Sequence, residues 1–189
     1  MQIIKHASTM IHPPIERTIY CYAEWNDAFH DLQNVEFVKG IEEQTVSREN
    51  LQGKRTLLVV DDLADSIGAE LAGALFTRYS HHRSISVIFL VHNLFFKMLR
   101  NYRLLALNTQ YYIIKKSVRD INSITTLGRQ IYGSHYKVLV DAYLDATQSQ
   151  FGYLFIDLRT ETDSALRLRT GIFPDDARYI IYRTKHGKI

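Results

Sequence analysis

Short, almost uninterrupted apolar runs alternate with segments of helical periodicity along this chain. The clearest runs are residues 56–60 and 86–91, and polar residues follow each of them at once. A strand that is apolar on both faces belongs in a parallel sheet that helices cover on both sides. The alternation therefore predicts βαβ units and an α/β fold with a mostly parallel sheet.

The same criteria assign an element to most of the chain. Strands are expected over residues 18–22, 35–38, 56–60, 86–91, 111–114, 153–158, 166–170 and 179–182. Helices are expected over residues 1–10, 25–32, 63–79, 119–132 and 135–146. The polar segment 40–54 is expected to be a surface loop that contains a short helix.

Proline occurs only at Pro13, Pro14 and Pro174, so nothing forces a break between the second and the third of these. The 189 residues, 46% of them hydrophobic and 23% charged, suit one globular domain with a proper core. A single domain over residues 1–189 is therefore predicted. Its end, residues 174–189, is interpreted as a basic tail that touches DNA or only aids solubility.

The single cysteine, Cys21, excludes an internal disulfide framework and fits a reducing compartment. No apolar run approaches the ~18 residues of a membrane span, and the first ten residues do not resemble a signal peptide. The net charge of +3 and the pI near 8.9 permit an anionic partner. We expect a cytoplasmic or nuclear protein, viral proteins included, that has no membrane partner.

Two adjacent carboxylates, Asp61 and Asp62, directly follow the apolar run 56–60. Ligands bind outside the carboxyl ends of parallel strands, and an apolar strand that ends in acids has the Walker B pattern. In that interpretation Asp61 orients Mg²⁺ through its water shell, and Asp62 polarises the water that attacks a γ-phosphate. The alternative is that one aspartate caps a helix that begins near Leu63.

His92 and Asn93 follow the run 86–91, where a polar side chain can hold the attacking water or sense a γ-phosphate. The alternative is a loop residue that bonds within its own turn. Arg78 and Arg83 precede the same run. A guanidinium fork suits phosphate, and ATPase rings use one from a neighbouring subunit, although a solvated surface arginine is the alternative.

Other polar pairs point less specifically to a site. His81 and His82 are adjacent, and no cysteine or carboxylate accompanies them at a metal-ligand spacing. Lys115 and Lys116 follow the run 111–114, where they contact phosphate or nucleic acid or are simply solvated.

The order of these pieces resembles the viral DNA-packaging ATPases of the FtsK/HerA branch of P-loop NTPases, especially those of poxvirus-like and Polinton (Maverick) elements. The resemblance covers residues 16–173 or so. It is carried by the segments RTIYCYAEWNDAF, TLLVVDDLAD, LFTRYSHHRSISVIFLVHNLF, LNTQYYIIKKSVRD, VDAYLDAT and FGYLFIDL.

The resemblance implies a three-layer α/β/α P-loop NTPase-like fold that uses ATP and Mg²⁺. It implies a homo-oligomeric ring that translocates double-stranded DNA into a capsid, with capsid proteins as further partners. Asp61 corresponds to the magnesium-orienting acid and Asp62 to the catalytic acid. Asn93 or His92 stands at the sensor position, and Arg83, ahead of Arg78, is the arginine offered to a neighbouring nucleotide.

One departure from that family is large, because none of the nine glycines opens a G-x-x-x-x-G-K-[ST] motif. The resemblance then implies a truncation before the first helix, which removes the phosphate loop and its strand. Loss of a central strand exposes apolar sheet edges. These 189 residues alone are not expected to hydrolyse ATP.

Three functions stay open from the sequence. The first is the ATPase motor domain, or its remnant, for DNA packaging. The second is a non-hydrolysing module derived from it that binds DNA or capsid protein. The third is an unrelated nuclease-like α/β enzyme that uses Asp61, Asp62 and Asp157 on a metal.

Overall fold

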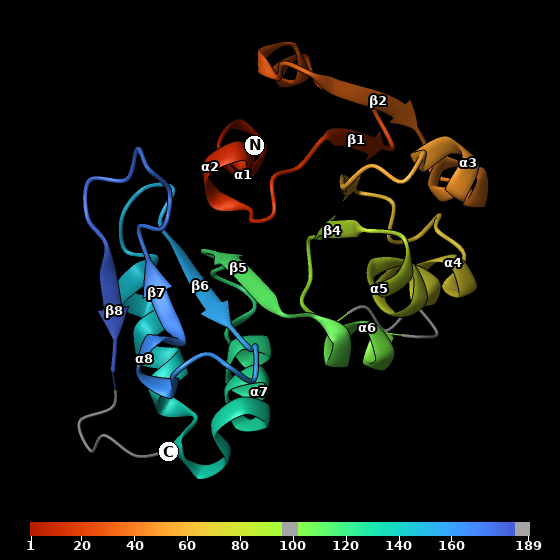
Figure 1. The fold of residues 1–189 in the computed structure, drawn as a ribbon. Helices are drawn as coiled ribbons and strands as arrows, with labels where there is room; N and C mark the ends of the chain where they lie inside the picture. Colours follow the sequence, from red (N-terminus) through yellow and green to blue (C-terminus); the bar gives the residue numbers. More distant parts are fainter. Residues whose placement is uncertain (96–101, 184–189) are drawn as a thin grey trace. The chain divides into compact units, whose positions relative to one another are not determined.

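The computed structural model describes residues 1–95 and 102–183, and the chain divides into two compact units, Met1–Asn108 and Thr109–Ile189 (Figure 1). The first unit holds a four-stranded parallel sheet and the second a four-stranded antiparallel sheet. The predicted α/β class is confirmed, whereas the single domain over residues 1–189 stays a prediction. Of the expected basic tail, residues 184–189 lie outside the described residues.

The strands of the first unit are β1 (Arg17–Tyr22), β2 (Val35–Lys39), β3 (Thr56–Asp61) and β4 (Ile85–Leu90). They are all parallel, in the order β2-β1-β3-β4, and their bounds agree with the predicted strands to within one residue. Tyr22 pairs with Asp61, and Asp61 pairs with Leu90. The carboxyl ends of these three strands therefore align at one edge of the sheet.

Both faces of the parallel sheet are packed, which explains why β3 is apolar throughout. Leu58 and Val60 pack with Leu75 in one buried cluster, and Leu57 and Val59 pack with Phe29 in another. The first cluster draws residues from helical segments that follow β2, β3 and β4, and the second from segments before and after β1. The helical segments described in this unit are α1 (Gln2–Lys5), α2 (Ala7–Met10), η1 (Asp27–Asp31), η2 (Glu43–Val46), α3 (Arg48–Leu51), α4 (Ala69–Ala74), the π-helical η3 (Leu75–Tyr79), α5 (Ser80–His82) and α6 (Tyr102–Asn108).

The helix predicted over residues 63–79 begins later than expected, at Ala69. Before it, the Ile67 amide donates to the Leu63 carbonyl over 2.8 Å in a single turn, and both side chains are buried. Residues four apart lie on the same face of an isolated turn as well as of a helix. The spacing of the apolar residues therefore could not distinguish an isolated turn at residues 63–67 from the first turn of a helix.

The second unit runs through β5 (Tyr111–Lys115), α7 (Ile121–Tyr132), η4 (Gly133–His135), α8 (Lys137–Ala146), β6 (Tyr153–Asp157), η5 (Ser164–Leu166), β7 (Leu168–Thr170) and β8 (Ile180–Tyr182). Its sheet has the order β5-β6-β7-β8 with antiparallel pairs throughout. One face is buried through Leu154, Ile156 and Leu168, and α8 contacts β6 and β7 (Figure 1).

The expectation of a mostly parallel sheet holds only for β1–β4, because β5–β8 are antiparallel. Parallel neighbours need a crossover of about a dozen residues or more, usually a helix. Only residues 158–167 separate β6 from β7, and they contain no helix longer than the short η5. A short link of this kind returns the chain in the opposite direction. The last strand, β8, takes up part of the segment interpreted as a tail.

Candidate functional site

The polar residues predicted at the carboxyl edge of the parallel sheet come together there. Asp61 is the last residue of β3 and Asp62 follows it, while His92 lies just beyond β4. His92 Nε2 is 3.3 Å from Asp62 Oδ1, with 84% and 65% of the two side chains exposed. A pair so exposed contributes little to stability, so its carboxylate and imidazole are open to a ligand. Asn93 is also exposed at this edge.

Asp61 is oriented by a residue that the sequence patterns did not single out. Tyr20, in the middle of β1 and 2% exposed, donates its hydroxyl to Asp61 Oδ2 over 2.7 Å. Burial first, and then this hydrogen bond, raise the pKa of Tyr20 above its ordinary value, so the phenol stays a donor. Tyr20 pairs with Val59, and Asp61 lies two residues after Val59 on the same face of the sheet. The alternation of faces along the strands was the only signal of the Tyr20–Asp61 contact in the sequence.

The Tyr20→Phe substitution is expected to lower the free energy of unfolding by about 1–2 kcal/mol, because the Asp61 carboxyl group loses the hydroxyl that donates to it while the ring stays in place. Urea denaturation monitored by circular dichroism measures the change. Tyr22→Phe, on the same strand and the same face, serves as the matched control and is expected to change stability by less than about 0.5 kcal/mol. Equal losses in the two variants contradict the orienting role.

The backbone of Asp62 departs from the strand conformation of β3. Its φ of 53° lies in the left-handed region, which aspartate tolerates better than most residues with a Cβ. The alternative role of the aspartates, capping the following helix, is wrong for α4. That helix begins at Ala69, its N-cap is Gly68, and no side chain bonds the cap.

The edge offers carboxylate oxygens, the type of ligand that Mg²⁺ takes. Within residues 1–95 and 102–183 no group of three or more His, Cys, Asp or Glu side chains could hold a metal ion. Mg²⁺ keeps several waters and is bound through one or two carboxylates plus phosphates, so Asp61 and Asp62 fit its donor set without a complete protein cage. Because no such group is found among the described residues, nothing there supports the predicted metal-binding triple of Asp61, Asp62 and Asp157.

Arg83 and Arg78 do not lie with the carboxylates. Arg83 precedes β4, at the opposite end of the strand from His92, and its Nη1 donates to the Val46 carbonyl over 2.6 Å. Its guanidinium also lies 3.5 Å from the centroid of the Tyr79 ring. Arg78 is exposed, and its guanidinium is 5.7 Å from the same centroid. A role for either arginine in a neighbouring subunit stays a prediction.

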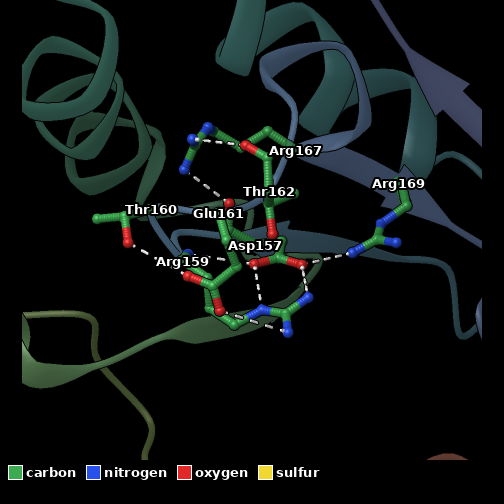
Figure 2. Close-up of polar contacts among 7 residues, drawn as sticks. All are labelled: Asp157, Arg159, Thr160, Glu161, Thr162, Arg167 and Arg169. Atoms are coloured by element: carbon green, nitrogen blue, oxygen red, sulfur yellow. Dashed lines mark hydrogen bonds and ion pairs between the residues drawn. The ribbon is translucent and has the colours of Figure 1, made fainter.

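A second polar cluster, which sequence reasoning missed, lies in the antiparallel unit (Figure 2). Asp157 is fully buried, and its Oδ2 accepts from Arg159 Nη2 at 3.0 Å and from Arg169 Nη2 at 2.8 Å. Arg159 also bonds Oδ1 through its Nε and its backbone amide, each at 3.2 Å. Burial acts to raise the pKa of Asp157, but the Arg159 bonds outweigh it and the pKa lies below its ordinary value.

The arrangement of Asp157 makes it a structural anchor. Arg167 Nη1 donates to the Asp157 carbonyl over 2.8 Å, so a third guanidinium joins the cluster (Figure 2). With its carboxylate enclosed by two arginines, Asp157 is not available as the metal ligand of the nuclease hypothesis. The signal in the sequence was the spacing of Arg159 two residues after the strand end, which carries little weight alone.

None of the helices in the part of the chain that the structure describes is long and apolar enough to cross a membrane. Comparison with known proteins finds no family model, no curated protein and no solved structure that matches this chain.

Proposed function

We propose that the edge formed by Asp61, Asp62 and His92 is the acidic side of an ATP-hydrolysing site of the FtsK/HerA packaging type, whose motor moves double-stranded DNA into a capsid. The observation that carries the proposal is the contact between Asp62 and His92 across neighbouring parallel strands, beside an Asp61 held by Tyr20. A water that attacks a phosphate needs an acidic residue to accept its proton and a polar residue to position it. The ends of the two neighbouring strands supply one of each.

Each residue has a distinct role in this proposal. Tyr20 occupies one oxygen of Asp61 and leaves the other to face the water shell of Mg²⁺. Asp62 takes up the proton of the attacking water, and His92, with Asn93 beside it, positions that water or the terminal phosphate. Bound Mg²⁺ supplies neutralisation of charge on the β- and γ-phosphates.

The proposed assembly is a homo-oligomeric ring around double-stranded DNA, with an arginine reaching the nucleotide of the next subunit. Arg78 is the better placed of the two candidates, because it is exposed while Arg83 is bonded to Val46 within its own unit. The P-loop NTPase-like fold is part of the same proposal. It is supported by the parallel order of β1–β4 and by the acids at the end of the inner strand β3.

Isothermal titration of the full chain with a slowly hydrolysed ATP analogue, with and without Mg²⁺, tests the proposal. We expect binding that Mg²⁺ strengthens, and we expect Asp61→Asn to weaken the Mg²⁺-dependent affinity by about tenfold or more. Asp65→Asn, an exposed carboxylate four residues later, is the matched control and leaves the affinity unchanged. A chain that binds no nucleotide, or an Asp61→Asn variant that binds as the wild type does, contradicts the proposal.

A second candidate function is a non-hydrolysing module that binds DNA or capsid protein. Two observations favour it. The 189 residues contain no G-x-x-x-x-G-K-[ST], whose backbone amides and lysine grip phosphates. The net positive charge of the chain also comes from residues 109–189, because residues 1–108 carry eleven lysines and arginines against twelve aspartates and glutamates. Absence of nucleotide binding in the titration above favours this candidate.

A further inference from the structure

The antiparallel sheet has one face that the α7–α8 side does not bury. Residues two apart along a strand share a face, and Ile113 pairs with Phe155 while Phe155 pairs with Arg169. Tyr111, Ile113 and Phe155 therefore lie on the face opposite Leu154 and Ile156. Tyr111 is 42% exposed, whereas Leu154 and Ile156 are completely buried.

Two stacked aromatic rings form the centre of this face. The rings of Tyr111 and Phe155 are stacked, with centroids 5.6 Å apart and planes inclined by 27°. The guanidinium of Arg159 lies 5.2 Å from the Tyr111 centroid, and that of Arg169 lies 4.8 Å from the Phe155 centroid. An exposed ring with a cation over it offers a planar surface and positive charge at one place.

Asp157 keeps both arginines in these positions. It binds Arg159 and Arg169 at the same time (Figure 2). One negative charge therefore holds two positive ones beside the rings. Glu161 adds a second carboxylate only 3.8 Å from Arg159 Nη1, at the rim of the cluster. Holding planar groups in advance reduces the entropy lost when a planar ligand stacks on them.

Lysines continue the face at the other end of β5. Lys115 and Lys116 are exposed and, with Gln148, Ser149 and Phe151, line a hollow of about 290 Å³. Phe151 holds its backbone at a φ of 65° and leaves its ring 81% exposed beside the lysines. Lys115 lies four residues after Tyr111 on the same sheet face, about 14 Å along the strand at ~3.4 Å per residue.

The net charge of this unit matches a polyanion. Residues 109–189 carry twelve lysines and arginines against eight aspartates and glutamates, a formal excess of four positive charges, whereas residues 1–108 carry an excess of one negative charge. An excess of positive charge of this size favours an anionic partner for this unit.

We infer that the face formed by Tyr111, Phe155, Arg159, Lys115 and Phe151 binds single-stranded nucleic acid. Unpaired bases stack on the exposed side chains of Tyr111 and Phe151, with the half-buried Phe155 supporting Tyr111, and the phosphates between them face the lysines and guanidinium groups. Four-stranded sheets with helices on one face bind single strands in this way, with two or three bases on aromatic side chains. A duplex cannot use the rings, because its bases are already stacked on one another. The inference is independent of the proposed nucleotide site.

Fluorescence anisotropy of a labelled oligo(dT) of about 12 nucleotides, titrated with the full chain at low salt, tests the role of the rings. Tyr111→Leu keeps an apolar side chain but removes the ring, and we expect it to raise Kd by at least about fivefold. Tyr111→Phe keeps the ring and is expected to bind as the wild type does. Leu144→Ala, at an exposed apolar residue of α8, is the control for surface changes elsewhere in the unit.

The lysines have a separate readout in the salt dependence. The slope of log K against log salt concentration is expected to fall by about 0.7 for each of Lys115→Ala and Lys116→Ala, while Lys137→Ala, at an exposed residue of α8, leaves it unchanged. Circular dichroism establishes that each variant is folded.

Three results overturn the inference. The first is a wild-type chain that does not bind the oligonucleotide. The second is Tyr111→Leu binding as tightly as Tyr111→Phe. The third is tighter binding of a duplex of the same length, which assigns the basic face to double-stranded DNA.

Discussion

Replacing Asp157 by asparagine is expected to lower the free energy of unfolding of the antiparallel unit by about 3–5 kcal/mol. The substitution keeps the shape of the side chain but removes the negative charge that pairs with both Arg159 and Arg169. Removing one partner of a buried ion pair is strongly destabilising, because the remaining charges keep their desolvation cost without compensation. Urea denaturation followed by the fluorescence of the tyrosines and by circular dichroism measures the loss.

Asp141→Asn provides the control for this experiment. Asp141 is an exposed aspartate of α8, and its substitution is expected to change stability by less than about 0.5 kcal/mol. A loss in Asp157→Asn that is no larger than this control contradicts the anchoring role.

The same carboxylate makes the stability depend on pH in a defined direction. The pKa of Asp157 in the folded chain lies below its ordinary value of 3.8. The folded state therefore releases this proton more readily than the unfolded chain, whose aspartates titrate near pH ~3.9. The stabilisation is fully present above that pH and is lost as the pH falls through the lower, folded pKa. In Asp157→Asn this part of the acid dependence is expected to be absent.

In a longer chain that also carries a G-x-x-x-x-G-K-[ST] loop, replacing Asp62 by asparagine is expected to lower ATP turnover by about 10²–10⁴-fold, the contribution typical of a positioned general base. Asparagine keeps the size of the side chain and its contact distance to His92, but it cannot accept the proton of the attacking water. Because Asp61 is unchanged, Mg²⁺-dependent binding of the nucleotide is expected to stay within about threefold of the wild type. Phosphate release in the presence of double-stranded DNA measures turnover.

Asp65→Asn is the matched control for turnover, because it removes an exposed carboxylate from the same turn between β3 and α4. Equal turnover in the wild type and in Asp62→Asn removes Asp62 from the proposed role. A longer wild-type chain that carries the loop and binds nucleotide without turning it over contradicts hydrolysis at this edge and favours the non-hydrolysing module.

Part of the candidate site could be predicted from the sequence. The run 56–60 identified a strand, the two aspartates after it marked its end, and His92 marked the end of the next strand. Because parallel strands align their carboxyl ends, the gathering of Asp62 and His92 was predictable in kind. The hydrogen bond from Tyr20 to Asp61 was not, because it depends on which strand lies next to β3 and in which register.

The strand directions of the antiparallel unit and the contacts of Asp157 could not be predicted from the sequence. Its strands were all expected, yet they were assigned to the wrong kind of sheet, because an apolar run contains no information on the direction of its neighbour. Asp157 was considered only as a metal ligand, since Arg169 lies on another strand and reaches it only once β6 and β7 pair.

By itself, then, the sequence determined which segments are strands and helices and which side chains stand at strand ends. Periodicity and the length of apolar runs are properties of each segment alone, and they indicate which of its side chains are suited to burial. The tertiary structure decided the pairing directions, the bond between Tyr20 and Asp61, and the arginines held over Tyr111 and Phe155. These contacts join residues far apart in the chain, and the free energy that selects them comes from packing and hydrogen bonding that exist only after the sheets form.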